Sequence, residues 1–170
     1  MEKNKVIQAV RNAGIIGAGG AGFPTNAKIN ANVDTVIING AECEPLLYKD
    51  KELMRLFPED MVAGLDIVMK ITGASAGIIA LKAKNKEAIP VLNEISRKYK
   101  GIKVVIIDDV YPSGDEVVLV YEVTGRIVPP GGIPLNVGCV VSNTETFINI
   151  NYAVKNNKPV TEKYLTLAGE

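Results

Sequence analysis

Four short, continuous runs rich in valine and isoleucine lie along the chain, and turn-forming residues bound each of them. A half-buried strand would alternate apolar and polar positions, whereas a strand buried on both faces of a parallel sheet is apolar throughout. The runs therefore predict four buried strands, at residues 35–39, 78–81, 103–107 and 139–141.

Three longer stretches carry the start and stop signals of helices. The first begins with a proline, which suits the first turn, and each is followed within two residues by a glycine, which readily takes the left-handed conformation that ends a helix. Pro90 falls inside the second stretch, so that helix is expected to start late or to kink. The predicted helices are residues 58–71, 86–99 and 115–123.

Strands that alternate with helices predict a layered α/β fold, here a Rossmann-like sheet of mainly parallel strands flanked by helices. The chain has 170 residues, 47% of them hydrophobic, which suits one domain with its own core. Three segments rich in glycine and proline interrupt the alternation, and loops of this kind usually carry function on such a scaffold. They are residues 14–25, 40–50 and 126–138.

Charge and hydropathy narrow the classes of partner. Lysine plus arginine and aspartate plus glutamate both total 19, so nothing indicates the basic surface that nucleic acid or anionic lipid requires. No stretch approaches the roughly 20 apolar residues of a membrane span, and residues 1–14 lack the long uncharged apolar run that is typical of a signal peptide. We therefore expect a cytoplasmic protein without direct membrane insertion, whose partners are small molecules or other proteins.

Reactive side chains are scarce. The chain has no histidine, which removes the commonest general base, metal ligand and partner of a serine or cysteine nucleophile. Cys43 and Cys139 stand far apart and predict neither a disulfide framework nor a zinc or iron–sulfur site. We expect no catalytic side chain and no metal ligand, so a cofactor would carry any chemistry.

Residues 17–22 read Gly-Ala-Gly-Gly-Ala-Gly, which matches the G-x-G-x-x-G pattern of dinucleotide sites. A Rossmann fingerprint directly succeeds a strand and opens a helix, whereas residues 5–13 here read as an amphipathic helix and Phe23-Pro24 interrupts any helix after the glycines. The glycines can take positive φ and let the backbone close on a ligand. Taken alone, they favour a cradle for an anion or ring and a merely flexible loop about equally.

Extended to Lys28, the same string, GAGGAGFPTNAK, resembles the flavin loop of the complex I flavin subunit and of RnfC, a component of the Rnf complex. Four further motifs resemble elements of that family, and they stand in its order. They are NGAECEP at 39–45, YPSGDE at 111–116, VPPGGIP at 128–134 and SNTET at 142–146.

The resemblance implies an FMN-dependent NADH:acceptor oxidoreductase. FMN would be the cofactor and NADH the substrate, and electrons would pass from the flavin to iron–sulfur clusters outside this sequence. Residues 1–170 would form a single FMN- and NADH-binding domain, a fragment of a longer electron-transfer protein. Other subunits of an electron-transfer complex would be its partners and could hold it at the periphery of a membrane.

A flavin mononucleotide needs a phosphate site and polar partners for the edge of its ring. Backbone N–H groups of residues 17–20 and the ammonium of Lys28 suit the phosphate. Asn39 and Asn143 end two predicted strands, where ligands gather in open α/β sheets, although both could also be turn or cap residues. The resemblance implies cofactor contacts at Gly17, Gly19, Gly20, Lys28, Asn39, Glu42, Glu44, Tyr111, Gly114, Asp115, Glu116, Asn143 and Thr144.

Candidate substrate-binding residues are Phe23, Glu42 and Asp115. The two carboxylates can accept hydrogen bonds from ribose hydroxyls and repel the extra phosphate of NADPH, which would favour NADH; the alternative is a solvated acidic loop. Phe23 could stack on adenine or simply belong to the core. We expect the acidic segments 40–44 and 114–116 to converge at the carboxyl ends of neighbouring strands.

Two positions depart from the family's pattern. Ala41 stands where the complex I protein has an aspartate, and Asp115 stands where RnfC has a second glycine. Asp115 also resembles PrdC-like relatives of RnfC, so both branches stay open. The alternative function is a non-catalytic nucleotide-binding or docking module of an electron-transfer complex, such as a proline reductase system.

Overall fold

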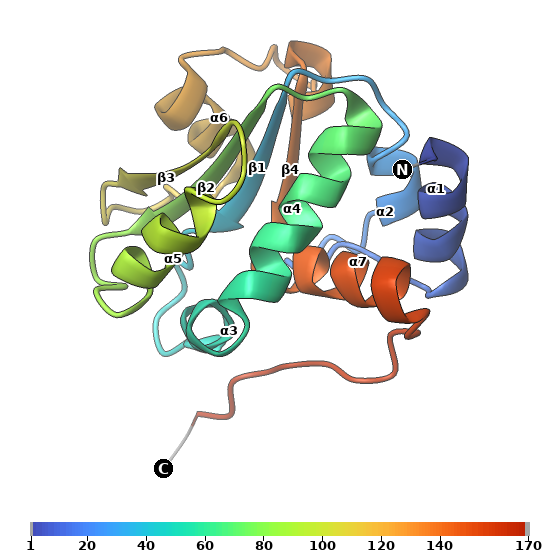
Figure 1. The fold of residues 1–170 in the computed structure, drawn as a ribbon. Coiled ribbons are helices and arrows are strands. Elements are labelled where there is room, and N and C mark those ends of the chain that lie inside the picture. Colours follow the sequence, from blue (N-terminus) through green and yellow to red (C-terminus); the bar gives the residue numbers. More distant parts are fainter. Residues whose placement is uncertain (1, 169–170) are drawn as a thin grey trace.

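The computed structural model describes residues 2–168 and contains a four-stranded, fully parallel sheet (Figure 1). The strands lie in the order β3-β2-β1-β4. Each predicted strand is confirmed, with one or two further residues at its ends. Their bounds are β1 Thr35–Gly40, β2 Ala76–Lys82, β3 Ile102–Ile107 and β4 Cys139–Asn143.

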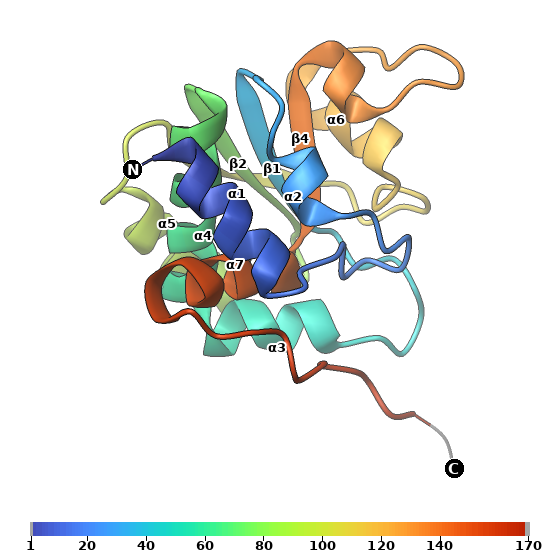
Figure 2. The same cartoon turned by 90° about the vertical axis from the view of Figure 1, so that its right-hand side faces the viewer.

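Helices cover both faces of the sheet, which confirms the predicted α/β class (Figures 1 and 2). They are α1 Lys3–Asn12, α2 Thr25–Lys28, α3 Lys49–Leu56, α4 Pro58–Thr72, α5 Ala88–Ser96, α6 Glu116–Thr124 and α7 Thr144–Asn156, with a 3₁₀ turn η1 at Pro134–Val137. Helices α4, α5 and α6 confirm the three predictions, and α1 confirms the amphipathic helix expected at residues 5–13, whereas α2, α3 and α7 were not predicted. Within residues 2–168, no helix is both long and apolar enough to cross a membrane.

The proline signals agree with the starts of α4 and α5, and the glycine signals agree with the ends of α4 and α6. Helix α5 begins at Ala88, which places Pro90 in the first turn, where its missing N–H leaves no hydrogen bond unmade. The late start is therefore confirmed, and the helix also ends at Ser96, three residues earlier than the predicted end at 99. Gly73 and Gly125 end α4 and α6 in the left-handed conformation, with φ of 79° and 74°.

The sheet separates two apolar cores. Val36 and Ile38 of β1 point into the larger core, which α1, α4, α5 and α7 cover, and Ile37 points into the smaller core beneath α6. Because both faces are covered, successive positions of an interior strand are apolar. The edge strand β3 departs from the prediction of full burial: Ile106 is 54% exposed, since an edge strand has a neighbour on one side only.

Helices α4 and α7 approach each other closely at a glycine. A Cβ atom at Gly64 of α4 would collide with the backbone carbonyl of Phe147 in α7, and the Phe147 side chain is fully buried. This contact fixes the first turn of α7 against the rest of the larger core. Because α7 comes directly after β4, the contact also fixes the direction in which the chain leaves that strand.

The chain from β1 passes to β2 on one side, whereas β4 pairs with β1 on the other. Such a reversal of strand order marks the point where open α/β sheets bind ligands, outside the carboxyl ends of the strands. Figure 2 shows α2 beside β4 and α1 beside α2, with the C-terminal segment (residues 157–168) running on from α7 past α3. The topology therefore places residues 40–48, which follow β1, and residues 17–22 at the carboxyl ends of β1 and β4.

Candidate functional site

A cavity of about 920 Å³ lies at the carboxyl ends of β1 and β4, within the size range of small-molecule sites. Its walls include the glycine loop (residues 17–22), the acidic loop (residues 41–48) and the first turn of α6. The predicted site residues that line it are Gly17, Gly19, Gly20, Phe23, Lys28, Asn39, Glu42, Glu44, Tyr111, Gly114, Asp115, Glu116 and Asn143. The structure places Thr144 elsewhere, fully buried in the first turn of α7.

The glycine loop has a defined path between α1 and α2. The backbone N–H of Gly17 donates to the Phe23 carbonyl oxygen at 2.9 Å, and Ile16 pairs with Pro24 in an isolated antiparallel bridge. Gly20 and Gly22 have φ of 114° and 63°, conformations that L side chains disfavour. The turn of this loop therefore depends on glycine at these two positions.

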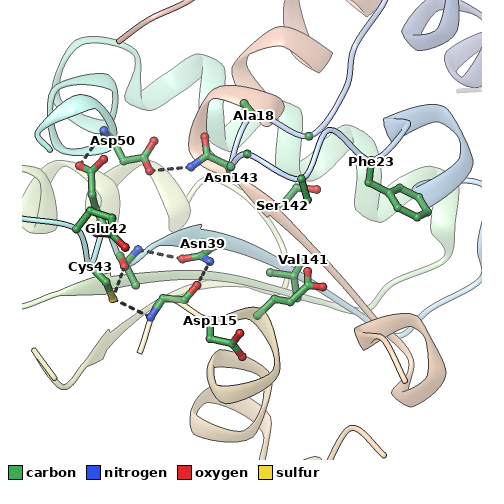
Figure 3. Close-up of a pocket in the computed structure, with 18 of the residues that line it drawn as sticks. Ala18, Phe23, Asn39, Glu42, Cys43, Asp50, Asp115, Val141, Ser142 and Asn143 are labelled. Carbon is green, nitrogen blue, oxygen red and sulfur yellow. Dashed lines mark hydrogen bonds between the residues drawn. The ribbon is translucent and has the colours of Figure 1, made fainter. Parts of the chain in front are cut away.

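Asn39 joins the two acidic segments. Its Oδ1 accepts the N–H of Ala41 at 3.1 Å, and its Nδ2 donates to the Gly114 carbonyl oxygen at 2.8 Å (Figure 3). The N–H of Gly114 in turn donates to Cys43 Sγ at 3.0 Å. A Cβ atom at Gly114 would lie 2.9 Å from that sulfur. The contact therefore requires glycine, and it holds the start of α6 against the end of β1.

The expected convergence of the acidic segments is therefore present, but the strands that bring them together are not neighbours. Gly114 lies after β3 in the chain, and β2 lies between β3 and β1 in the sheet. Residues 108–115 must cross the carboxyl end of β2 to reach Asn39. The prediction of neighbouring strands was wrong because strand order is set by long-range pairing, which the order of motifs along the chain does not reveal.

Asn143 pairs with Asn39 across the ladder between β4 and β1. Its Oδ1 caps α7 by accepting the N–H of Glu145 at 3.1 Å, so the interpretation as a cap residue is correct. Its Nδ2 donates to Asp50 Oδ2 at 2.7 Å, and the N–H of Asp50 donates to Glu42 Oε2 at 3.3 Å (Figure 3). Asn143 thus connects β4 to α3 and, through α3, to the acidic loop.

The carboxyls of Asp50 and Glu42 lie in a poorly solvated place. Burial raises the pKa of Asp50, against the opposing effects of the Lys49 ammonium and the Asn143 amide. Burial also raises the pKa of Glu42, and the adjacent Asp50 carboxylate adds to that shift. Asp50 Oδ1 accepts no hydrogen bond within the described residues, although Lys49 Nζ lies 3.5 Å away. Burial therefore opposes ionisation of both carboxyls.

Lys28 brings a cation into the same cavity. Its Nζ donates to the Val141 carbonyl oxygen at 2.9 Å and lies 5.4 Å from the centre of the Phe23 ring. Burial lowers the pKa of Lys28, and the Glu116 carboxylate at 3.9 Å opposes that shift only in part. A partly desolvated ammonium of this kind is suited to an anionic ligand, because a second negative charge would stabilise it.

Phe23 and the acidic loop lie at opposite ends of the cavity (Figure 3). The Phe23 side chain is 40% exposed, so the interpretation of Phe23 as a core residue was wrong. Glu42 is partly buried, and the interpretation as a solvated acidic loop does not describe it. A substrate that contacted both residues would have to extend along the cavity, as a dinucleotide can.

Asp115 has a structural role at the cavity wall, where it caps α6. Its Oδ1 accepts the N–H groups of Val117 and Val118 at 2.9 and 3.1 Å, so it is the N-cap of α6 and not its first helical residue. The N–H groups at the start of a helix favour negative charge. The wall formed by α6 therefore already holds one carboxylate by its own backbone.

Sequence reasoning missed the polar residues that α3 contributes. Lys49 and Asp50 begin that helix directly after the acidic loop and line the cavity, as Cys43 and Ser142 also do. A signal was present, because residues 49–57 carry acidic residues in the first turn and apolar residues at 53, 54, 56 and 57. The segment was instead assigned as loop as far as Asp50.

Comparison with known proteins identifies a family. The family described as the Nuo51 FMN-binding domain matches residues 10–152. The cobalamin reductase PduS of Citrobacter freundii is 48% identical over 162 residues, covering 95% of this chain and 36% of that protein. The C subunit from the Na⁺-translocating ferredoxin:NAD⁺ oxidoreductase complex of Acetobacterium woodii is 37% identical, covering 100% of this chain and 39% of that protein.

Solved structures give the same relationship. An NAD⁺-reducing [NiFe]-hydrogenase in the air-oxidized state contains a chain that superposes with a TM-score of 0.80 and 30% sequence identity. The match covers 91% of this chain and 31% of the other. The chain thus spans between about a third and two-fifths of the length of these relatives.

The variant Asp50→Asn tests whether the pKa of Asp50 is raised in the folded state, because such a shift makes the free energy of unfolding depend on pH. A raised pKa means that the folded state binds the proton more tightly, so the stability Asp50 contributes is present below its unfolded pKa of ~3.9 and is lost as pH rises through the higher folded value. Asparagine does not titrate. The free energy of unfolding of the variant relative to the parent should therefore rise by roughly 1 kcal/mol between pH 4 and pH 7, measured by urea denaturation.

Glu52→Gln on the same helix is the matched control, because Glu52 pairs with Arg55 at the surface. Its stability relative to the parent should change little over the same pH range. If the difference in free energy of unfolding between Asp50→Asn and the parent stays constant with pH, the pKa of Asp50 is not raised in the folded state.

Proposed function

The chain belongs to the Nuo51 FMN-binding domain family, and on that basis we propose that it binds FMN in the cavity at the carboxyl ends of β1 and β4 and transfers electrons from NADH to it. The observation that carries the proposal is Lys28, a partly buried ammonium in the same cavity as the glycine loop. A phosphate there would supply the negative charge that Glu116 supplies only in part.

The residues present fit this cofactor. The glycine loop presents backbone to the cavity without side chains at residues 17, 19, 20 and 22, so a flat ring or a phosphate can approach it closely. The cavity volume of about 920 Å³ lies near the top of the range for small-molecule sites, which leaves space for a nicotinamide nucleotide beside the flavin. Bound FMN would supply the hydride-accepting and one-electron chemistry.

Residues of this chain would hold and orient the flavin. The two polar atoms of the Asn39 amide and Nδ2 of Asn143 make one hydrogen bond each and have capacity for another. Oδ1 of Asn143 already accepts two, from the N–H of Glu145 and from Lys49 Nζ. The adjacent positions of the two asparagines on β1 and β4 make them candidates for the polar edge of the flavin. Lys28 would hold the phosphate, and the backbone N–H groups of the glycine loop would add donors.

We assign NADH as the electron donor. Two of the relatives, the Acetobacterium protein and the hydrogenase, carry NAD⁺ in their names. In this chain, Glu42 and Asp115 provide carboxylates for ribose hydroxyls and Phe23 provides an aromatic face at the far end of the cavity. Their positions support a dinucleotide that lies along the cavity.

We further propose that the electrons leave to iron–sulfur clusters carried by other parts of a longer protein. The relatives are about two and a half to three times as long as the matched region. Some of them are named as subunits of ion-translocating complexes, which supports partner subunits that hold the protein at the periphery of a membrane. The first electron acceptor would then dock near the open side of the cavity.

The direct test is optical. Protein stripped of ligand, incubated with FMN and desalted should stay yellow, and the flavin absorbance should bleach when NADH is added without oxygen. Retained flavin without bleaching would support a nucleotide-binding or docking module in place of the oxidoreductase. Complete loss of flavin on desalting, with no quenching of FMN fluorescence at micromolar protein, would contradict FMN binding itself.

Lys28→Met tests the phosphate assignment, because it keeps the apolar stem and removes the charge. A charged hydrogen bond contributes about 1.5–3 kcal/mol, so affinity for FMN should fall roughly ten- to a hundredfold. Riboflavin, which lacks the phosphate, should lose much less. Fluorescence-quench titrations with both ligands measure this difference, and equal losses would move Lys28 from the phosphate to the ring.

The double variant Glu42→Gln and Asp115→Asn tests nucleotide choice. Both changes preserve shape, and asparagine can still cap α6. A 2′-phosphate ~4 Å from a carboxylate is repelled by at least ~1 kcal/mol even in bulk water, so NADH should reduce the parent's flavin several-fold faster than NADPH. The ratio should shrink in the double variant. Stopped-flow bleaching measures both rates, and an unchanged ratio would remove these carboxylates from the nucleotide site.

A further inference from the structure

Resting on the proposed FMN site, we propose that Lys163 in the C-terminal segment is a positioning residue of the glycine loop. It acts together with Lys49 and the buried carboxylate of Glu145. The C-terminal segment would thereby be a determinant of cofactor affinity, although it lies outside the region that the family match covers.

The peptide groups of Ala18 are the anchor of the glycine loop. The Ala18 N–H donates to Thr146 Oγ1 of α7 at 3.1 Å. The Ala18 carbonyl oxygen accepts from two ammonium groups, Lys49 Nζ and Lys163 Nζ, each at 3.4 Å. Three separate parts of the chain, α7, α3 and the C-terminal segment, therefore hold this one residue between Gly17 and Gly19.

Glu145 organises the two ammonium groups. Its side chain is only 1% exposed, and its Oε2 lies 3.2 Å from Lys49 Nζ and 2.6 Å from Lys163 Nζ. Its Oε1 accepts the N–H of Tyr164 at 3.3 Å. A buried carboxylate requires such partners, so Glu145 draws the C-terminal segment against α7. The same contact directs the Lys163 ammonium toward the Ala18 carbonyl.

The C-terminal segment is held to the rim of the cavity at further points. Its Val160 N–H donates to the Ala13 carbonyl oxygen at 2.9 Å, and the Tyr164 ring lies 5.8 Å from the Phe57 ring. The N–H of Tyr48, at the end of the acidic loop, donates to Thr166 Oγ1 at 3.1 Å. Leu165 and Thr166 line the cavity. The segment therefore connects the glycine loop to the acidic loop along one side of the site.

The effect on the cofactor arises from the conformational freedom of the loop. A glycine-rich turn has many conformations, and only those that match the flavin bind it, so the observed dissociation constant rises as the competent fraction falls. Contacts that hold Ala18 before the cofactor arrives raise that fraction. Removing Lys163 leaves the Glu145–Lys49 pair in place, so the fold should persist while the loop becomes less ordered.

The experiment compares Lys163→Met with Lys163→Arg and with Lys158→Met in the complete chain. Lys158 belongs to the same segment but pairs with Glu162 at the surface and provides the control. FMN titrations should give about a tenfold weaker affinity for Lys163→Met, equivalent to ~1.4 kcal/mol. Affinity should be largely restored in Lys163→Arg and unchanged in Lys158→Met. Hydrogen exchange of residues 17–22 in the FMN-free protein should be faster only in Lys163→Met.

Unchanged flavin affinity together with unchanged loop exchange in Lys163→Met would overturn the inference. Faster exchange spread over the whole chain, with a matching fall in Tm, would also overturn it, because Lys163 would then serve general stability. If the parent chain itself fails to bind FMN, the proposed function fails. The exchange measurement needs no flavin and still decides whether Lys163 holds the loop.

Discussion

Two asparagines at the carboxyl ends of adjacent strands hold the walls of the cavity in place. Asn39 and Asn143 are partners in the ladder between β1 and β4. The Asn39 amide holds two loops together, and the Asn143 amide holds the starts of α3 and α7. Asn39 binds the backbone at Ala41 and Gly114, and Asn143 binds Asp50 while it caps α7. The separation of the walls is therefore set by the spacing of two neighbouring strands, which the sheet fixes.

The charged side chains around the cavity form two groups. Around the acidic loop, burial and the Asp50 carboxylate raise the pKa of Glu42, burial and the Glu145 carboxylate raise the pKa of Asp50, and Lys49 opposes both shifts. At the Phe23 end of the cavity, the Lys28 ammonium has the Glu116 carboxylate 3.9 Å away. A ligand with a negative end and a polar, uncharged end would match this division, because it would place its charge next to the ammonium and away from the carboxyls.

The sequence was sufficient for much of the fold because the strongest signals are local. Runs such as 35–39 indicate strands buried on both faces, and a glycine such as Gly73 ends a helix because its backbone takes the left-handed conformation. Where the outcome depended on distant pairing, prediction failed. The exposure of Ile106 reflects the edge position of β3, and the path of residues 108–115 reflects strand order.

The candidate site, too, could be predicted only in part. The motifs predicted which loops would gather, because ligands bind at the carboxyl ends of parallel strands. They did not reveal that Asp115 is a helix cap or that Thr144 is buried beneath the cavity, since both depend on where a helix starts. The sequence did not predict the roles of Lys49, Glu145 and Lys163, because their contacts join segments that lie far apart along the chain.

The pairing of β1 with β4 also links cofactor binding to folding. Strands β1, β2 and β3 are joined in sequence by single crossovers, whereas the β1–β4 ladder joins residues about a hundred positions apart and so carries a larger loss of chain entropy on closure. The cavity exists only once that ladder is complete. A ligand that binds there stabilises the last and most distant strand pairing of the sheet in proportion to its concentration. In a cell, the supply of such a ligand would then govern how much of the newly made chain reaches and keeps the folded state.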